Sequence, residues 1–155
     1  MENYTKLNAL LKVAGWFGDT RNLLTELKKH KNFKLVRKTQ PNGRSRFSAK
    51  KGKYTAYVPR HSQFEKDPVV SLHHESGHFF DILKRHIKDD PEYSTGREIL
   101  RNEQRANRHA IKHITDKKDV KAYIKSVKPD YEAYKKWTAV NFKRTKINKQ
   151  LRNPY

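Results

Sequence analysis

The chain has 155 residues, and its 36 lysines and arginines against 16 aspartates and glutamates give a formal charge of +20. This length fits one compact domain. The absence of cysteine excludes a disulfide scaffold, cysteine catalysis and zinc sites built on thiolates. No apolar run is long enough to cross a bilayer, and residues 1–4 do not begin a secretory signal. We therefore expect no membrane contact and a cytoplasmic protein, within a host cytoplasm if the small basic chain is a phage or mobile-element product.

The amino-terminal part of the chain carries short helical and strand patterns. Leucines at helical spacing predict helices at residues 3–14 and 19–29, and Asp19 and Thr20 are candidates for the cap of the second helix. Residues 33–36 are expected to form a short strand. Residues 44–49 and 53–58 flank a Lys-Lys-Gly turn sequence, which predicts an antiparallel hairpin.

The remainder of the chain is predicted to be helical. The pair Asp67-Pro68 is typical of a helix start and predicts a helix over residues 69–87. Further helices are expected at residues 97–114, 116–127 and 129–142, followed by a loose basic tail at 143–155. We therefore expect a single domain of mostly helical α+β class, with a small antiparallel edge sheet before the third helix.

The sequence H-E-S-G-H at positions 74–78 carries the clearest chemistry. On a helix, His74 and His78 lie about 40° apart, so both imidazoles can bind one metal ion from adjacent turns. Glu75 lies roughly 100° from His74, where it can hold and deprotonate a water on zinc. The segment is otherwise apolar, and two buried histidines need polar partners, which a metal supplies. Gly77 would let another segment approach this face closely.

A zinc site with an open position needs a third protein ligand. Glu103 lies on the apolar face of the expected helix 97–114, whereas Glu98 lies on the face that carries its arginines. A lone carboxylate on an apolar face is costly unless a cation meets it. We therefore expect Glu103 to complete the site, with Zn²⁺ as the cofactor.

The polar residues near these ligands have more than one interpretation. Asp81 is placed to accept the second ring N–H of a ligating histidine, or to pair with Arg85 as an ordinary helix carboxylate. Asn107 is a further candidate for the histidine contact, while His73 is interpreted as a packing or surface residue. Four residues are candidates for stabilising an oxyanion, although the two histidines among them also fit structural roles: Tyr57, Tyr93, His109 and His113.

These motifs resemble those of the gluzincin metallopeptidases. More narrowly, they resemble the motifs of the ImmA/IrrE family, which are H-E-x-G-H and, on a second helix, E-x-x-A-N-x-F-A. The corresponding segments of this chain are H-E-S-G-H and E-Q-R-A-N-R-H-A. The likeness covers about residues 53–114. Asp81 after the first motif is also similar to lethal-factor-type peptidases. The resemblance implies a zincin-like core with His74, His78 and Glu103 as zinc ligands and Glu75 as general base.

The same resemblance implies a role for the strand that precedes the motif. In such enzymes an edge strand aligns the peptide substrate, which here would be Tyr54, Thr55, Ala56 and Tyr57 in residues 53–58. We therefore expect a zinc-dependent endopeptidase that hydrolyses a protein or peptide substrate, such as a transcriptional repressor or another regulator. The motifs predict no oligomeric state.

The positive charge is spread along the chain and is especially dense in residues 117–152. This charge has two interpretations. It can form a surface that binds nucleic acid as part of the function, or a solvated cationic surface that binds polyanions only weakly. The alternative function is therefore a basic nucleic-acid-binding protein whose zinc site is structural or vestigial. Aromatic residues interleave with these basic residues at a spacing that favours a helical core stripe: Tyr123, Tyr131, Tyr134, Trp137 and Phe142.

Overall fold

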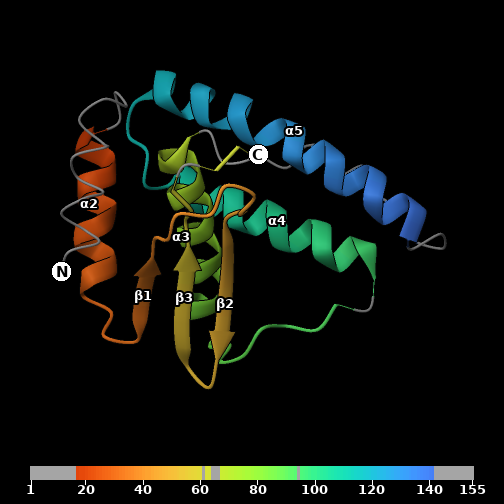
Figure 1. Ribbon diagram of the computed structural model, residues 1–155, viewed down its shortest axis with the longest axis horizontal. Coiled ribbons are helices and arrows are strands. Elements are labelled where there is room, and N and C mark those ends of the chain that lie inside the picture. The colour runs from red at the N-terminus through yellow and green to blue at the C-terminus, as the bar shows by residue number, and fades with distance from the viewer. Residues whose placement is uncertain (1–16, 61, 64–66, 94, 142–155) are drawn as a thin grey trace.

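The computed structural model describes residues 17–60, 62–63, 67–93 and 95–141. This part of the chain confirms the mostly helical α+β class; the helix expected at 3–14 and the tail at 143–155 lie outside it. Figure 1 shows the arrangement of the elements, which follow in chain order as α2 (Phe17–Lys28), β1 (Phe33–Val36), β2 (Arg46–Lys50), β3 (Lys53–Tyr57), α3 (Pro68–Lys84), α4 (Gly96–Ile111) and α5 (Lys117–Asn141).

The three strands form one mixed sheet in the order β1-β3-β2. β2 and β3 make the predicted antiparallel hairpin, with Lys50 opposite Lys53. Lys51 and Gly52 form its turn at φ 50° and 71°, which suits the twist of a two-residue hairpin. β1 lies parallel to β3 on the other side, with Phe33 opposite Tyr54.

This order corrects the expectation that residues 53–58 form an edge strand. β3 is paired along both sides, so its backbone has no free edge on which a peptide could align. Tyr54, Thr55, Ala56 and Tyr57 therefore do not form the substrate strand. The two edges of the sheet belong to β1 and β2.

α3 is the central element of the fold. It packs against the sheet and also contacts α2, α4 and α5. Its start follows the sequence pattern: Pro68 occupies the first turn, and the Asp67 carboxylate accepts hydrogen bonds from the backbone N–H groups of Val69 at 3.0 Å and Val70 at 3.3 Å. The helix ends at Lys84, short of residue 87. Because α3 is covered on several sides, it carries its polar motif into the interior.

The start of α4 is fixed by a capping box. The Thr95 hydroxyl accepts the Glu98 backbone N–H at 3.2 Å, and the Glu98 carboxylate accepts the Thr95 backbone N–H at 3.1 Å. Glu98 is exposed, as the charge pattern predicted. It stabilises the helix end and leaves the apolar face of α4 to Glu103.

Residues 117–141 form the single helix α5, so the expectation of separate helices at 116–127 and 129–142 is wrong. Pro129 lies inside α5, where its missing N–H removes only one helical hydrogen bond. One buried face continues across it and supports the unbroken helix: Tyr123, Val127, Tyr131 and Thr138. No helix in the described part of the chain is long and apolar enough to cross a membrane.

α2 is anchored to the rest of the fold by two polar side chains that the sequence suggested as helix caps. Both lie within the helix instead. Asp19 accepts hydrogen bonds from the backbone N–H and hydroxyl of Thr115 at 3.1 Å and 2.8 Å. The Thr20 hydroxyl lies 3.1 Å from His73 Nε2, and His73 is completely buried. His73 is therefore a packing residue, one of its two predicted roles.

Candidate metal centre

The two motif histidines lie side by side on one face of α3. The ring centroids of His74 and His78 are 4.8 Å apart. The His78 ring also stacks on Phe47 of β2, with a centroid distance of 6.3 Å and an angle of 14° between the planes. One face of α3 thus holds both imidazoles between the sheet edge and α4.

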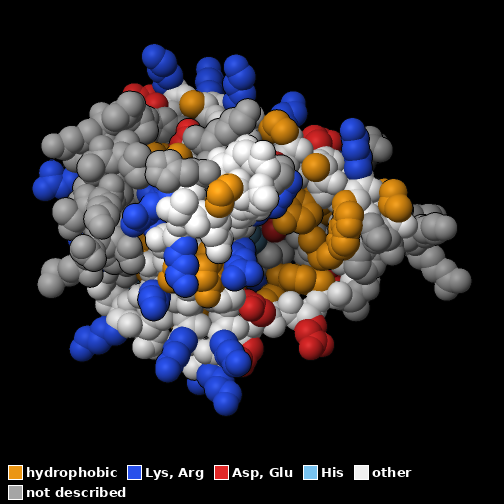
Figure 2. All heavy atoms as spheres, in the orientation of Figure 1, with side chains coloured by type: hydrophobic (Ala, Val, Ile, Leu, Met, Phe, Trp, Pro, Cys, Tyr) orange, Lys and Arg blue, Asp and Glu red, His pale blue; other side chains and the backbone are white. Residues whose placement is uncertain are grey.

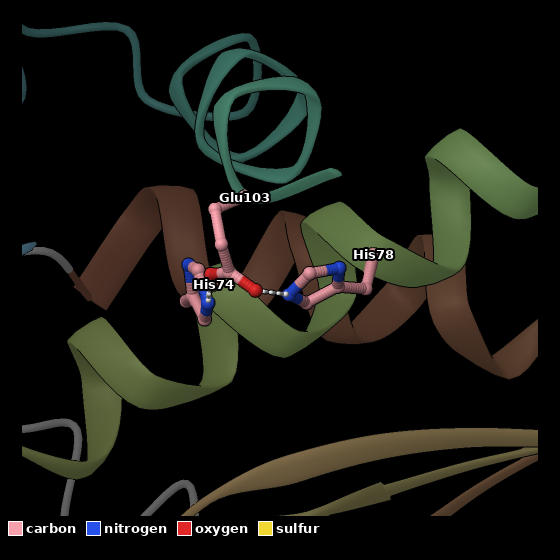
Figure 3. A group of neighbouring side chains, drawn as sticks. All are labelled: His74, His78 and Glu103. Atoms are coloured by element: carbon pink, nitrogen blue, oxygen red, sulfur yellow. Dashed lines mark ion pairs between the residues drawn. The ribbon is translucent and has the colours of Figure 1, made fainter. Parts of the chain in front are cut away.

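Glu103 comes from α4 and meets both histidines (Figure 3). Its Oε2 lies 3.1 Å from His74 Nε2, and its Oε1 lies 3.5 Å from His78 Nε2. The ligand atoms that the three residues offer lie within 4.8 Å of one another. Two imidazole nitrogens and one carboxylate oxygen are a donor set that suits a divalent transition metal. The helical periodicity therefore predicted a cluster that can hold a metal ion.

Close packing of α3 and α4 brings these residues together. A Cβ added at Gly77 would meet the backbone of Ala106, at 2.8 Å from its carbonyl carbon and nearer still to its oxygen. Real side chains do not fit in that space, so glycine is required at this contact. The structure thus bears out the expected close approach at Gly77.

Asn107 orients His74. Its Oδ1 lies 3.0 Å from His74 Nδ1 and accepts a second hydrogen bond, 2.8 Å long, from the hydroxyl of the buried Tyr123. Because a carbonyl oxygen can only accept, Nδ1 must carry a proton, which leaves Nε2 to face Glu103. This is the usual support of a metal-binding imidazole. The sequence predicted Asn107 but not Tyr123.

His78 has a partner that the sequence analysis missed. The Asn102 Nδ2 lies 3.2 Å from His78 Nδ1. When Nε2 of His78 binds a metal, its Nδ1 carries the proton, and the Asn102 amide must turn so that its oxygen accepts that proton. An amide side chain can serve either state of the ring.

Asp81 does not support the histidines. Its Oδ2 lies 3.1 Å from Arg85 Nη1 and 3.0 Å from Arg105 Nε, and Oδ1 lies 3.9 Å from His109 Nε2. The second interpretation of Asp81, pairing with Arg85, is therefore the correct one. Arg105 of α4 supplies a second cation and draws the carboxylate away from His74.

Burial and charge together set the protonation of the cluster. Burial by itself lowers the pKa of His74, but the hydrogen bond and charge of Glu103 outweigh it and raise this pKa to about 10. Burial by itself raises the pKa of the Glu103 carboxyl. The charge of His78 and hydrogen bonds from both histidines outweigh burial and hold this pKa well below its usual range. A metal ion that binds here must therefore displace a proton from His74.

Glu75 is the remaining carboxylate of the motif. Its side chain is only 3% exposed, and burial raises its pKa, against the neighbouring charges of His74 and His78. A raised pKa makes a carboxylate a stronger proton acceptor. Glu75 is thus a buried carboxylate with a raised pKa beside the cluster that could hold a metal ion.

A cleft lies beside these residues, between β2, α3, α4 and the loop that follows α3. Figure 2 shows the hollow next to the sheet, with hydrophobic side chains gathered along one side of it. All three ligands and Glu75 line this cleft. The cluster that could hold a metal ion and the buried carboxylate of Glu75 therefore face the same cleft.

Of the four candidates for oxyanion stabilisation, only Tyr93 lines the cleft. Arg46 lies over the Tyr57 ring at 4.5 Å, and His113 stacks on Phe80 at a centroid distance of 4.5 Å. His109 faces Asp81. These three residues thus have contacts elsewhere.

Tyr134 of α5 also lines the cleft. Sequence spacing grouped it with a core stripe, and Tyr123 and Tyr131 of that stripe are indeed buried, whereas Tyr134 is 42% exposed and Trp137 is 50% exposed. Phe142 lies outside the described residues. The stripe is therefore exposed from Tyr134 onward, and Tyr134 is its member that lines the cleft.

The chain thus contains a candidate metal centre of two imidazoles and one carboxylate at the base of a cleft. No family model matches the chain, and no curated protein or solved structure is significantly similar to it. The argument for its function therefore comes from the geometry of the site.

Proposed function

We propose that this protein is a zinc-dependent peptidase of the gluzincin kind. The observation that carries the proposal is the position of Glu75, a buried carboxylate that lines the same cleft as His74, His78 and Glu103 without being one of the clustered ligands. Iron oxygenases use a similar donor set. A buried carboxylate immediately after the first ligand favours hydrolysis, because peptide cleavage by water needs a base there.

The three clustered residues would hold the ion and leave part of its coordination sphere open to the cleft. A zinc ion held there supplies Lewis acidity, which acidifies water and polarises a carbonyl group. Glu75 accepts the proton of the attacking water and returns it to the departing amine nitrogen. Two phenol hydroxyls that line the cleft, those of Tyr93 and Tyr134, are the donors that we assign to the developing oxyanion.

Asn107 and Tyr123 support this chemistry from outside the cleft. The Asn107 oxygen fixes the tautomer of His74, and the Tyr123 hydroxyl fixes the Asn107 amide. Three elements, α3, α4 and α5, therefore hold His74 in its ligating orientation.

The proposal is tested with the substitution Glu75→Gln, which keeps the shape of the side chain and removes the base. Protein loaded with zinc is incubated with a mixed peptide library, and the products are identified by mass spectrometry. Wild type should cleave, whereas Glu75→Gln should bind zinc equally and cleave about 10²- to 10⁴-fold more slowly. The matched control is Glu92→Gln, an exposed acid of the loop after α3. Full activity in Glu75→Gln would contradict the mechanism.

A second candidate function rests on the outer face of the sheet. Four exposed cations lie on this face with no acidic side chain among the strand residues, and Figure 2 shows basic side chains over this region. Such a surface favours binding of a polyanion such as nucleic acid. Affinity for DNA or RNA that falls steeply with salt, without cleavage of any peptide, would favour this function over the peptidase. The four cations are Lys34, Arg46, Lys50 and Lys53.

A further inference from the structure

The free edge of β2 is short because a loop already covers one end of it. The Ala49 backbone N–H donates to Asp90 Oδ1 at 2.7 Å, and the Asp90 backbone N–H donates to the Ala49 carbonyl oxygen at 2.9 Å. Beside them, the Lys51 backbone N–H donates to Asp89 Oδ1 at 2.8 Å. The Asp89–Asp90 segment therefore occupies the position that an added strand would take at this end of β2.

Strand geometry shows which backbone groups remain for a peptide. Successive residues of an edge strand direct their N–H and C=O groups alternately toward the sheet and away from it. Since the groups of Ala49 point away from β3, those of Phe47 point the same way, and Phe47 lines the cleft. Within the described part of the chain, the edge of β2 that Asp89 and Asp90 leave uncovered therefore centres on Phe47.

The metal ligands lie level with this short edge. Phe47 stacks on His78, one of the clustered ligands. Ala49 is two residues further along β2, which is about 7 Å in an extended strand. A peptide that pairs with Phe47 therefore has room for about two residues between the ligands and Asp90.

Charge determines which end of a peptide fits there. Apart from the three clustered residues and Glu75, the charged residues in the described part of the chain that line the cleft are Asp90, at the covered end, and Arg46. The Arg46 guanidinium lies over the Tyr57 ring on the outer face of the sheet, so Asp90 supplies the charge at the covered end. Lys50, Lys51 and Lys53 belong to the hairpin but do not line the cleft. A free α-amino group is attracted to Asp90, and an α-carboxylate is repelled by it.

We propose, on the basis of the peptidase function above, that the cleft holds substrates by their amino-terminal end. The free α-amino group lies at Asp90, and about two residues separate it from the bond that is cleaved. A chain in this orientation runs antiparallel to β2, as β3 does on the other side. The activity is thereby narrowed from the internal cleavage expected from the sequence to cleavage close to a free amino terminus.

The experiment uses the zinc-loaded full chain and one peptide library in two forms, with free and with acetylated amino termini. Mass spectrometry should place the cuts within the first few residues of the free peptides. Acetylation should lower the cleavage rate about fivefold, because it removes one partly exposed ion pair. Cuts spread along the peptides without regard to their amino terminus would overturn the proposal, as would cuts gathered at the carboxyl terminus.

A matched pair of variants separates charge from coverage of the strand. Asp90→Asn keeps a side-chain oxygen for the Ala49 N–H but loses the charge, so it should retain the cut positions and lose the discrimination against acetylated peptides. Glu92→Gln makes the same change on an exposed acid of the same loop, and both properties should persist. Full discrimination in Asp90→Asn would overturn the role of its charge. If wild type cleaves neither the free nor the acetylated library, the peptidase function itself is overturned.

Discussion

Replacing Gly77 by alanine tests whether the contact between α3 and α4 builds the metal centre. The added Cβ would lie 2.8 Å from the carbonyl carbon of Ala106, whereas carbon atoms in contact normally lie about 3.5–4.0 Å apart. α4 must therefore withdraw by about 1 Å. Glu103 lies one turn away on α4 and moves with it, while metal–ligand distances tolerate only about 0.2 Å.

Two opposing effects determine the stability of Gly77→Ala. Alanine favours a helix over glycine by about 1 kcal/mol, and overpacking of this kind costs about 1–3 kcal/mol. We expect a free energy of unfolding of the metal-free protein that is lower by up to about 2 kcal/mol. Metal affinity should fall by about 10- to 100-fold, as it does when the groups that support a ligand are disturbed.

Thermal unfolding with and without zinc, together with zinc titration against a chromophoric chelator, measures both effects. The matched control is Ser76→Ala, at the neighbouring buried position, whose hydroxyl has no hydrogen-bond partner within the described part of the chain. This control should bind zinc as wild type does. If Gly77→Ala also binds zinc with wild-type affinity, the close approach of the helices does not position Glu103 and the reasoning is refuted.

Three further predictions concern protons and supporting contacts. Because Glu103 raises the pKa of His74 to about 10, zinc binding near neutral pH should release about one proton, which calorimetry in buffers of different ionisation enthalpy measures; no release would contradict the ion pair. The same raised pKa makes the stability of the metal-free protein depend on pH. The ion pair between His74 and Glu103 contributes its full stability below about pH 6.5, the pKa of histidine in the unfolded chain, and this contribution is lost as pH rises toward about 10. Denaturant unfolding across this pH range should show the loss. Tyr123→Phe removes the hydrogen bond to Asn107, so it should lower the free energy of unfolding by about 1 kcal/mol and weaken zinc binding. Unchanged zinc affinity would show that Asn107 does not support the metal centre.

Helical periodicity was sufficient to predict the ligand cluster. His74 and His78 share a face because of their spacing along one helix, and Glu103 was singled out from Glu98 by the face it occupies. These are local properties of two helices. Their close packing then follows from small residues, Gly77 and Ala106, which were also visible in the sequence.

Pairing between distant segments could not be read from such patterns. The hairpin β2–β3 was predicted because its strands are adjacent in sequence, but the parallel pairing of β1 with β3 is not local and places β3 in the centre of the sheet. Likewise, Asp81 has the helical angle to reach His74, yet Arg105 on α4 pairs with it. Tyr134 was missed because spacing along α5 does not show where the core ends and the cleft begins.

The most direct test of the metal centre is the zinc content of the purified protein and of two matched variants. Inductively coupled plasma mass spectrometry should find about one zinc per chain in wild type and in Glu98→Gln, which neutralises an exposed acid of the same helix and keeps an oxygen for the capping box. Glu103→Ala should retain almost none. Equal zinc in Glu103→Ala and wild type, or no zinc in any of the three, would contradict the assignment of His74, His78 and Glu103 as the ligands.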